Sequence, residues 1–177
     1  MVKTIQSQEI TLRYLVDNFG LQLVRDEQFF REWQDDLPEI SDWEKELLNQ
    51  VQEGYFNLLQ NPPFLEDIVR MAIVDPILFI GKFFLYPYHI RSENPINLEL
   101  ADKEVIIRGR IDALVMKEQL WMMVIESKRA EFSIEAGLAQ LLTYLIASSY
   151  PEHPNYGLIV TEEIRSQASY FKGIKSG

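Results

Sequence analysis

The sequence predicts an α/β protein in which helices cover a mixed sheet. From residue 64 onward, the apolar segments follow the order helix, three strands, helix and strand. The three strand-type segments are joined by short polar connections, which is typical of antiparallel hairpins. At 177 residues, the chain has the length of a single domain that buries its own core.

Residues 1–63 are predicted to form a helical extension of this domain. An apolar pattern covers residues 10–16, and a second stripe at helical spacing runs from Phe29 to Leu37. The sequence Ser-Asp-Trp-Glu at residues 41–44 is typical of a capping box at the start of a longer helix. Two prolines at residues 62–63 are expected to end that helix.

Residues 64–177 are predicted to form the α/β domain itself. Its first helix begins near Phe64, and Asp75-Pro76 is expected to kink or split it because proline lacks a backbone N–H. The remaining predicted elements are strands at 96–100, 104–116 and 120–127, a helix between Ser133 and Pro151, and a strand at 156–160.

The composition restricts the chemistry that the chain can perform. It contains no cysteine, which excludes disulfides, thiolate catalysis, zinc fingers and iron–sulfur clusters. With only His89 and His153, neither a histidine-rich metal site nor a Ser-His-Asp triad is expected. Carboxylates and lysine are therefore the expected catalytic groups.

The net charge of −10 is unevenly distributed. Residues 1–66 carry 13 acidic and 5 basic side chains, so most of the excess negative charge lies in the first third. This balance argues against a general DNA-coating protein but leaves room for a local nucleic-acid site. No segment approaches the roughly 20 apolar residues that a membrane span needs, so we expect a cytoplasmic protein without membrane contact.

Alternation along the second predicted strand assigns its side chains to two faces. Arg108, Arg110 and Asp112 are expected to share one face. Ile111 and Ala113 are expected to share the other face. Leu114 is expected on the same face as the three charged side chains, and Ile107 and Val115 on the same face as Ile111 and Ala113.

Three charged side chains on two neighbouring strands form the candidate site. Glu126 and Lys128 are two residues apart and share a face, and a hairpin can place Asp112 beside Glu126. Adjacent carboxylates repel, and Mg²⁺, which prefers hard oxygen ligands, would relieve the repulsion. Lys128 would then stabilise the charge of a phosphoryl transition state. The alternative is a solvated sheet face with weak ion pairs.

These residues resemble a known signature. Ile-Asp at 111–112 followed by Val-Ile-Glu-Ser-Lys at 124–128 resembles the split motif of the PD-(D/E)XK nuclease superfamily. Gln140 and Tyr144 are similar to the Q-x-x-x-Y element of its RecB-like and type I restriction branches. Glu66 and the following Ile-Val-Asp-Pro at 73–76 resemble the N-terminal nuclease domain of type I restriction enzyme R subunits, and the wording of residues 108–112 and 126–130 resembles small stand-alone bacterial proteins of that branch.

The resemblance implies a restriction-endonuclease-like αβββαβ core and a set of site residues. The implied metal ligands are Glu66, Asp112 and Glu126, the implied catalytic residues are Asp112, Glu126 and Lys128, and Gln140 and Tyr144 would line the site. The implied metal is Mg²⁺, with Mn²⁺ as a substitute. For Gln140 and Tyr144, the alternative is a partly exposed helix face.

The sequence departs from the family in two places. It has no phosphate-binding loop, so the motor that accompanies the type I nuclease domain is missing. Thr-Glu-Glu at 161–163 replaces the usual Asn-Gly after the last core strand. Arg108, Arg110 and Arg129 either contact DNA phosphates or balance nearby acids.

The expected function is therefore a magnesium-dependent phosphodiester hydrolase that acts on DNA, an endonuclease of the restriction or recombination type. The first alternative is a catalytically slow or partner-gated nucleic-acid-binding subunit with the same fold. The second is an acidic interaction protein whose ion cluster is structural. Expected partners are DNA and either a second copy of the chain or other restriction or recombination subunits.

Overall fold

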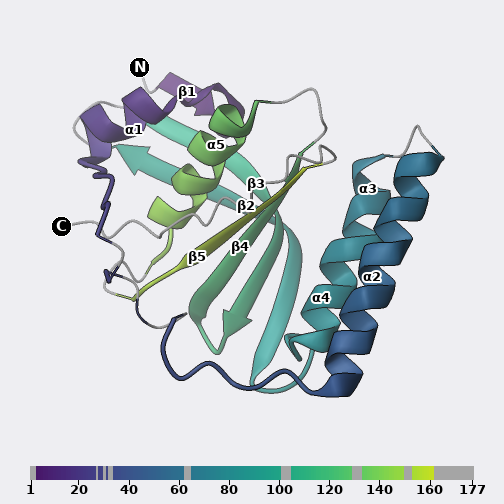
Figure 1. Ribbon diagram of the computed structural model, residues 1–177. Coiled ribbons are helices and arrows are strands. Elements are labelled where there is room, and N and C mark those ends of the chain that lie inside the picture. Colours follow the sequence, from purple (N-terminus) through teal and green to yellow (C-terminus); the bar gives the residue numbers. More distant parts are fainter. Residues whose placement is uncertain are drawn as a thin grey trace.

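The computed structural model describes residues 3–26, 28–29, 31, 34–61, 65–100, 105–128, 133–149 and 153–161. Their architecture is α/β, with a mixed sheet of five strands flanked by helices (Figure 1). The described elements after residue 64 follow the predicted order of helix, three strands, helix and strand. None of the described helices is long and apolar enough to cross a bilayer.

The long strand β3 (Val105–Lys117) organises the sheet. Its one edge pairs antiparallel with β2 (Tyr88–Leu100) over the whole length of both strands. Its other edge is shared: β1 (Lys3–Gln6) pairs parallel with residues 105–108, and β4 (Leu120–Lys128) pairs antiparallel with residues 113–117. The strand β5 (Tyr156–Thr161) then adds parallel to β4.

Sharing one edge between two strands leaves a gap in the sheet. Between the end of the β1 pairing and the start of the β4 pairing, residues 109–112 of β3 have no described strand partner on that edge. We call this segment the strand fork. Its backbone groups on that side must be satisfied by side chains or water, because a buried unpaired amide or carbonyl is costly.

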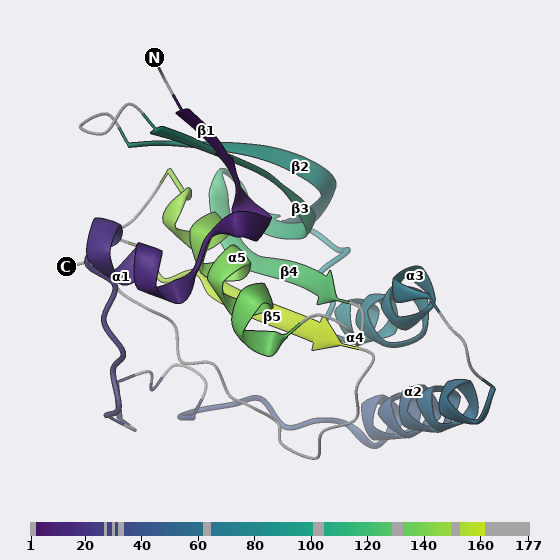
Figure 2. The ribbon, with the colours of Figure 1, turned by 90° about the horizontal axis from the view of Figure 1, so that it is seen from above.

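Helices cover both faces of the sheet. On one face lie α1 (Leu12–Phe19) and α5 (Ile134–Ile146), and on the other a broken helix made of α3 (Glu66–Val69), the π-helical turn η3 (Arg70–Val74) and α4 (Asp75–Ile80) (Figures 1 and 2). The helix α2 (Asp42–Gln60) packs outside η3 and α4.

At Asp75-Pro76, where the sequence predicts a kink or a split, the structure has a widened π-helical turn over Arg70–Val74. Pro76 cannot donate to the carbonyl four residues before it and its ring crowds that position. The preceding turn widens, and the Asp75 N–H bonds to the carbonyl of Arg70, five residues back. The helix therefore continues past the proline as α4.

The predicted caps at Ser41 and Ser133 are also confirmed. The Ser41 hydroxyl accepts from the Glu44 N–H, and the Glu44 carboxylate accepts from the Ser41 N–H at 2.8 Å. The Ser133 hydroxyl accepts from the Ala136 N–H at the start of α5. The apolar face of α2 is only half-buried, and no described residue of this helix is fully buried.

The expectation of an all-helical extension over residues 1–63 is wrong at its beginning. Lys3–Gln6 is a strand of the main sheet, and the buried Ile10 and Leu15 that follow belong to a core cluster with Ile107 of β3. Four residues carry too little periodicity to reveal a strand whose stability comes from its partner. The stripe from Phe29 to Leu37 is not an α-helix in the described residues of that segment.

The predicted alternation along β3 is wrong beyond the fork. Ile111 and Leu114 share a core cluster with Leu141 and Tyr144 of α5, whereas Ala113 packs on the opposite face with residues of η3 and α4. Strict alternation would put Ile111 and Ala113 on the same face. The cause lies opposite Asp112, where Glu93 of β2 has a positive φ of 54° between two regular pairs. This irregularity bends both strands and redirects their side chains (Figure 2).

Candidate functional site

A buried polar network lies at the strand fork, between β4, α5 and β3. The Gln140 side-chain amide donates to Oε1 of Glu126 at 2.7 Å and to the Tyr144 hydroxyl at 2.5 Å. Because a carboxamide nitrogen has two hydrogens, both donors of Gln140 are used. The two motif residues of α5 are therefore connected to the acidic residue of the β4 motif.

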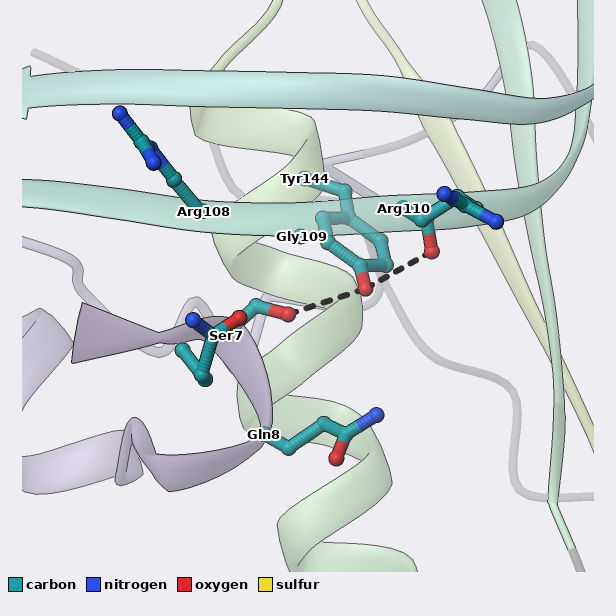
Figure 3. Close-up of a pocket in the computed structure, with 7 residues that line it drawn as sticks. Ser7, Gln8, Arg108, Gly109, Arg110 and Tyr144 are labelled. Carbon is teal, nitrogen blue, oxygen red and sulfur yellow. Dashed lines mark hydrogen bonds between the residues drawn. The ribbon is translucent and has the colours of Figure 1, made fainter. Parts of the chain in front are cut away.

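The Tyr144 hydroxyl closes the gap in the sheet. It donates to the backbone carbonyl of Arg110 at 3.0 Å, in the segment of β3 that has no strand partner on that edge. It also lies 3.0 Å from the Ser7 hydroxyl (Figure 3). With its one hydrogen given to Arg110, the phenol accepts from both Gln140 and Ser7.

All four side chains of this network are buried. The exposed fractions are 1% for Glu126, 4% for Gln140, 0% for Tyr144 and 2% for Ser7. Burial, and after it the nearby Glu126 carboxylate, raise the pKa of the Tyr144 phenol above its ordinary value of 10.0. The phenol therefore stays protonated at neutral pH and serves as a hydrogen-bond donor.

Gly109 allows this close packing. A Cβ at this position would overlap the Ser7 side chain and lie 2.6 Å from Cε1 of Tyr144. Only glycine leaves room for the end of β1, the phenol and β3 to meet. A glycine inside a strand pattern was the available signal for such an approach, whereas nothing in the sequence marks Ser7.

A pocket of about 280 Å³ opens beside the network (Figure 3). It is lined by Gln6, Ser7, Gln8, Arg108, Gly109, Arg110 and Tyr144. Both arginines are exposed at its rim, and Arg110 pairs with Glu93 of β2 at 2.9 Å. The predicted nucleic-acid residues Arg108 and Arg110 thus flank the fork, with one of them engaged by an acid.

Asp112 lies at the end of the fork, half-buried. Continuing the pairing Ala113↔Ile125 by one residue places position 112 opposite position 126 on the neighbouring strand. Asp112 lines a second cavity, of about 490 Å³, between β2, β3 and the broken helix. The two backbone positions are therefore neighbours on adjacent strands, and Oε1 of Glu126 lies toward α5, where it accepts from Gln140.

The other predicted residues are placed in part. Glu66 is the first residue of α3 and Lys128 is the last residue of β4, where it pairs with Thr161, but the side chains of both lie outside the described part. Arg129 lies outside the described residues altogether. The alternative of a partly exposed face for Gln140 and Tyr144 is wrong, since both are buried.

Metal binding rests on a limited donor set. Among the described side chains, no three or more acidic or histidine groups are gathered closely enough to hold a metal ion. Two carboxylates, Asp112 and Glu126, remain as oxygen donors on adjacent strands. That set fits Mg²⁺, which is commonly held by one or two carboxylates and completes its octahedron with water and phosphate oxygens.

Comparison with known proteins assigns no family to the chain. No protein-family model matches its sequence, and no curated protein matches it. The candidate site is therefore defined by its own contacts, among which the bond between Gln140 and Glu126 joins two separate sequence motifs.

Proposed function

We propose that this protein is a magnesium-dependent phosphodiester hydrolase that acts on DNA, with a restriction-endonuclease-like core. The observation that carries the proposal is the hydrogen bond from Gln140 to Glu126. A buried carboxylate is costly unless it is paired, so a fold that retains one at the end of an apolar strand has a use for it. The D…ExK and Q-x-x-x-Y residues resemble the signature of the PD-(D/E)XK nucleases, and this resemblance indicates that the use is metal-dependent hydrolysis of a phosphodiester.

The proposed roles come from the resemblance, and the contact between Gln140 and Glu126 supports them. Asp112 and Glu126 would hold Mg²⁺, which when bound lowers the pKa of a water molecule and neutralises charge that develops on the phosphate. Gln140 orients the Glu126 carboxylate through Oε1. Lys128, two residues beyond Glu126 on β4, is proposed to stabilise the transition state, and Glu66 is proposed as a further acidic ligand.

Cleavage of plasmid and single-stranded DNA, with and without Mg²⁺, tests this proposal. The wild-type chain should cleave in Mg²⁺ or Mn²⁺ and not in EDTA. Asp112→Asn and Glu126→Gln should each lower the rate at least about 100-fold, because a neutral amide binds the cation poorly. Glu53→Gln, at an exposed position of α2, is the matched control and should cleave like the wild type.

Two outcomes would contradict the proposal. One is unchanged cleavage by both Asp112→Asn and Glu126→Gln, with folding verified by thermal melting. The other is the absence of cleavage of any DNA by the wild-type chain in either metal.

A second candidate function is a nucleic-acid-binding or regulatory subunit with the same fold. It is favoured by the small donor set, because the described side chains include no cluster of three metal ligands. DNA binding that persists in Mg²⁺ without any cleavage would support this candidate over the hydrolase.

A further inference from the structure

The cavity that Asp112 lines has the size and walls of a ligand site. Its volume of about 490 Å³ falls in the range of roughly 300–1,000 Å³ that is usual for pockets holding small organic ligands. The broken helix α3–η3–α4 forms one wall and the strands β2 and β3 form the other. Its lining residues Leu78 and Ala113 belong to the core cluster on the α4 face of the sheet, and Asp112 joins the cavity to the strand fork.

Two aromatic rings contribute to the walls of this cavity. Phe84 is 51% exposed and lines the cavity, so its ring is accessible to a ligand there. Tyr88 is half-buried. Its ring makes an edge-to-face contact with the ring of Phe83, with 5.2 Å between the centroids and 63° between the planes, and this contact holds the Tyr88 ring in place. Exposed aromatic faces in a groove are the usual stacking surfaces for unpaired bases.

One cation, Arg70, lines the same cavity together with the carboxylates of Asp75 and Asp112. Arg70 of η3 is half-buried and, within the described part of the chain, forms no hydrogen bond or ion pair through its side chain. A partly desolvated guanidinium gains most from an anion that accepts two of its hydrogens, and phosphate is such an anion. Asp75, on the same wall, can accept from the exocyclic amino group of a base.

We propose that this cavity binds one unpaired nucleotide of a DNA strand, with its base against Phe84 and Tyr88 and its phosphate on Arg70. The proposal rests on the function inferred above, because it brings the nucleotide next to Asp112. The volume of about 490 Å³ is that of a site for one small organic ligand, so a single unpaired nucleotide is the form we propose. The preferred substrate is then single-stranded DNA or a duplex with unpaired bases.

Binding measured in EDTA tests the proposal without requiring cleavage. Fluorescence anisotropy would compare a labelled single-stranded oligonucleotide with the blunt duplex of the same sequence. The single strand should bind at least about fivefold more tightly. Phe84→Ala should weaken its binding about 5- to 100-fold, the range expected for the loss of one stacked base. Arg70→Gln should weaken it and reduce its salt dependence.

Phe79→Ala is the matched control, since Phe79 is also exposed and on α4 but does not line the cavity. It should bind like the wild type. Equal or tighter binding of the duplex would overturn the inference, as would unchanged binding by both Phe84→Ala and Arg70→Gln.

The two proposals fail separately. If single-stranded DNA binds in a way that depends on Phe84 but is not cleaved in Mg²⁺, the proposed hydrolase function is contradicted and the proposed nucleotide site is supported. If DNA is cleaved in Mg²⁺ but its binding is unchanged by Phe84→Ala and Arg70→Gln, the nucleotide site is contradicted and the hydrolase function is supported.

Discussion

Glu126 shows how a single charged residue is accommodated in an apolar strand. It follows the run Met122–Ile125 and is almost completely buried, yet Oε1 accepts a hydrogen bond from Gln140. The Gln140 amide donates its second hydrogen to the Tyr144 hydroxyl. That hydroxyl in turn donates to the backbone carbonyl of Arg110 in β3. Removing one member would leave a buried donor or acceptor unpaired, at a cost of about 1–3 kcal/mol.

The stability of the protein at alkaline pH should depend on Tyr144. Its raised pKa means that the folded state holds the phenolic proton more tightly than the unfolded state. Below about pH 10 both states keep this proton, and the contribution is fully present. Above that pH the unfolded state releases the proton first, so the free energy of unfolding falls, by up to about 1.4 kcal/mol per pH unit, until the folded state also ionises.

Urea denaturation between about pH 8 and pH 11 measures this effect. Tyr144→Phe should be less stable at neutral pH but should lose less stability as the pH rises. Tyr86→Phe, at a ring that is 97% exposed, should follow the wild type at every pH. An identical pH slope for Tyr144→Phe and the wild type would contradict the assignment.

At the scale of elements, the strand fork is the feature that creates the site. Because β1 and β4 share one edge of β3, the edge between them is open, and α5 supplies the tyrosine that closes it. The same segment carries the bend opposite Glu93, which puts Asp112 on the wall of the larger cavity. The ends of three elements thus meet around residues 109–112.

Gly109→Ala tests how tightly these elements meet. The added methyl group would overlap Ser7 and Tyr144, both buried, so the free energy of unfolding should fall by about 1–3 kcal/mol. Gly54→Ala is the control, because Gly54 lies within α2 with nothing near its Cβ position, and there alanine should raise helix stability by about 0.5–1 kcal/mol. Equal effects of the two substitutions in thermal or urea denaturation would contradict close packing at the fork.

At the scale of the whole molecule, the negative charge and the candidate site are partly separated. The helix α2 carries Asp42, Glu44, Glu46 and Glu53 and lies beyond α4, on the other side of the sheet from α1 and α5 (Figure 1). The excess negative charge on this outer helix favours solubility. Because it lies away from the strand fork, it does not prevent a DNA strand from reaching the fork. DNA binding, however, has few cations to rely on.

The salt dependence of DNA binding should accordingly be shallow. If Arg70, Arg108 and Arg110 contact phosphates, the logarithm of the affinity for single-stranded DNA should fall with the logarithm of salt concentration with a slope of about −2, since each contact contributes about −0.7. Arg108→Gln should reduce the slope by about 0.7. Arg13→Gln, which removes a guanidinium paired with Asp17 on α1, should leave it unchanged. A slope steeper than about −5 would indicate a broad phosphate-binding surface and contradict this account.

The sequence by itself determined the elements that depend on local signals. The capping serines, the disturbance of the helix at Pro76, the strands β3 and β4 and the last strand could be predicted, because caps, proline geometry and hydrophobic periodicity act within a few residues. The first of the three predicted strands, at 96–100, in fact begins at Tyr88, eight residues earlier. The resemblance of the motifs also implied that Gln140 and Tyr144 line the same site as Glu126, and the structure joins these three by hydrogen bonds.

Only the tertiary structure decided what depends on distant partners. β1 is a strand because β3 offers it an edge, Ser7 matters because Tyr144 reaches it across 137 positions of sequence, and Ala113 changes face because Glu93 bends the neighbouring strand. Pairing, burial and bending of this kind are set by contacts between segments far apart in the chain. Alternation within one strand cannot report them, because it assumes a regular strand.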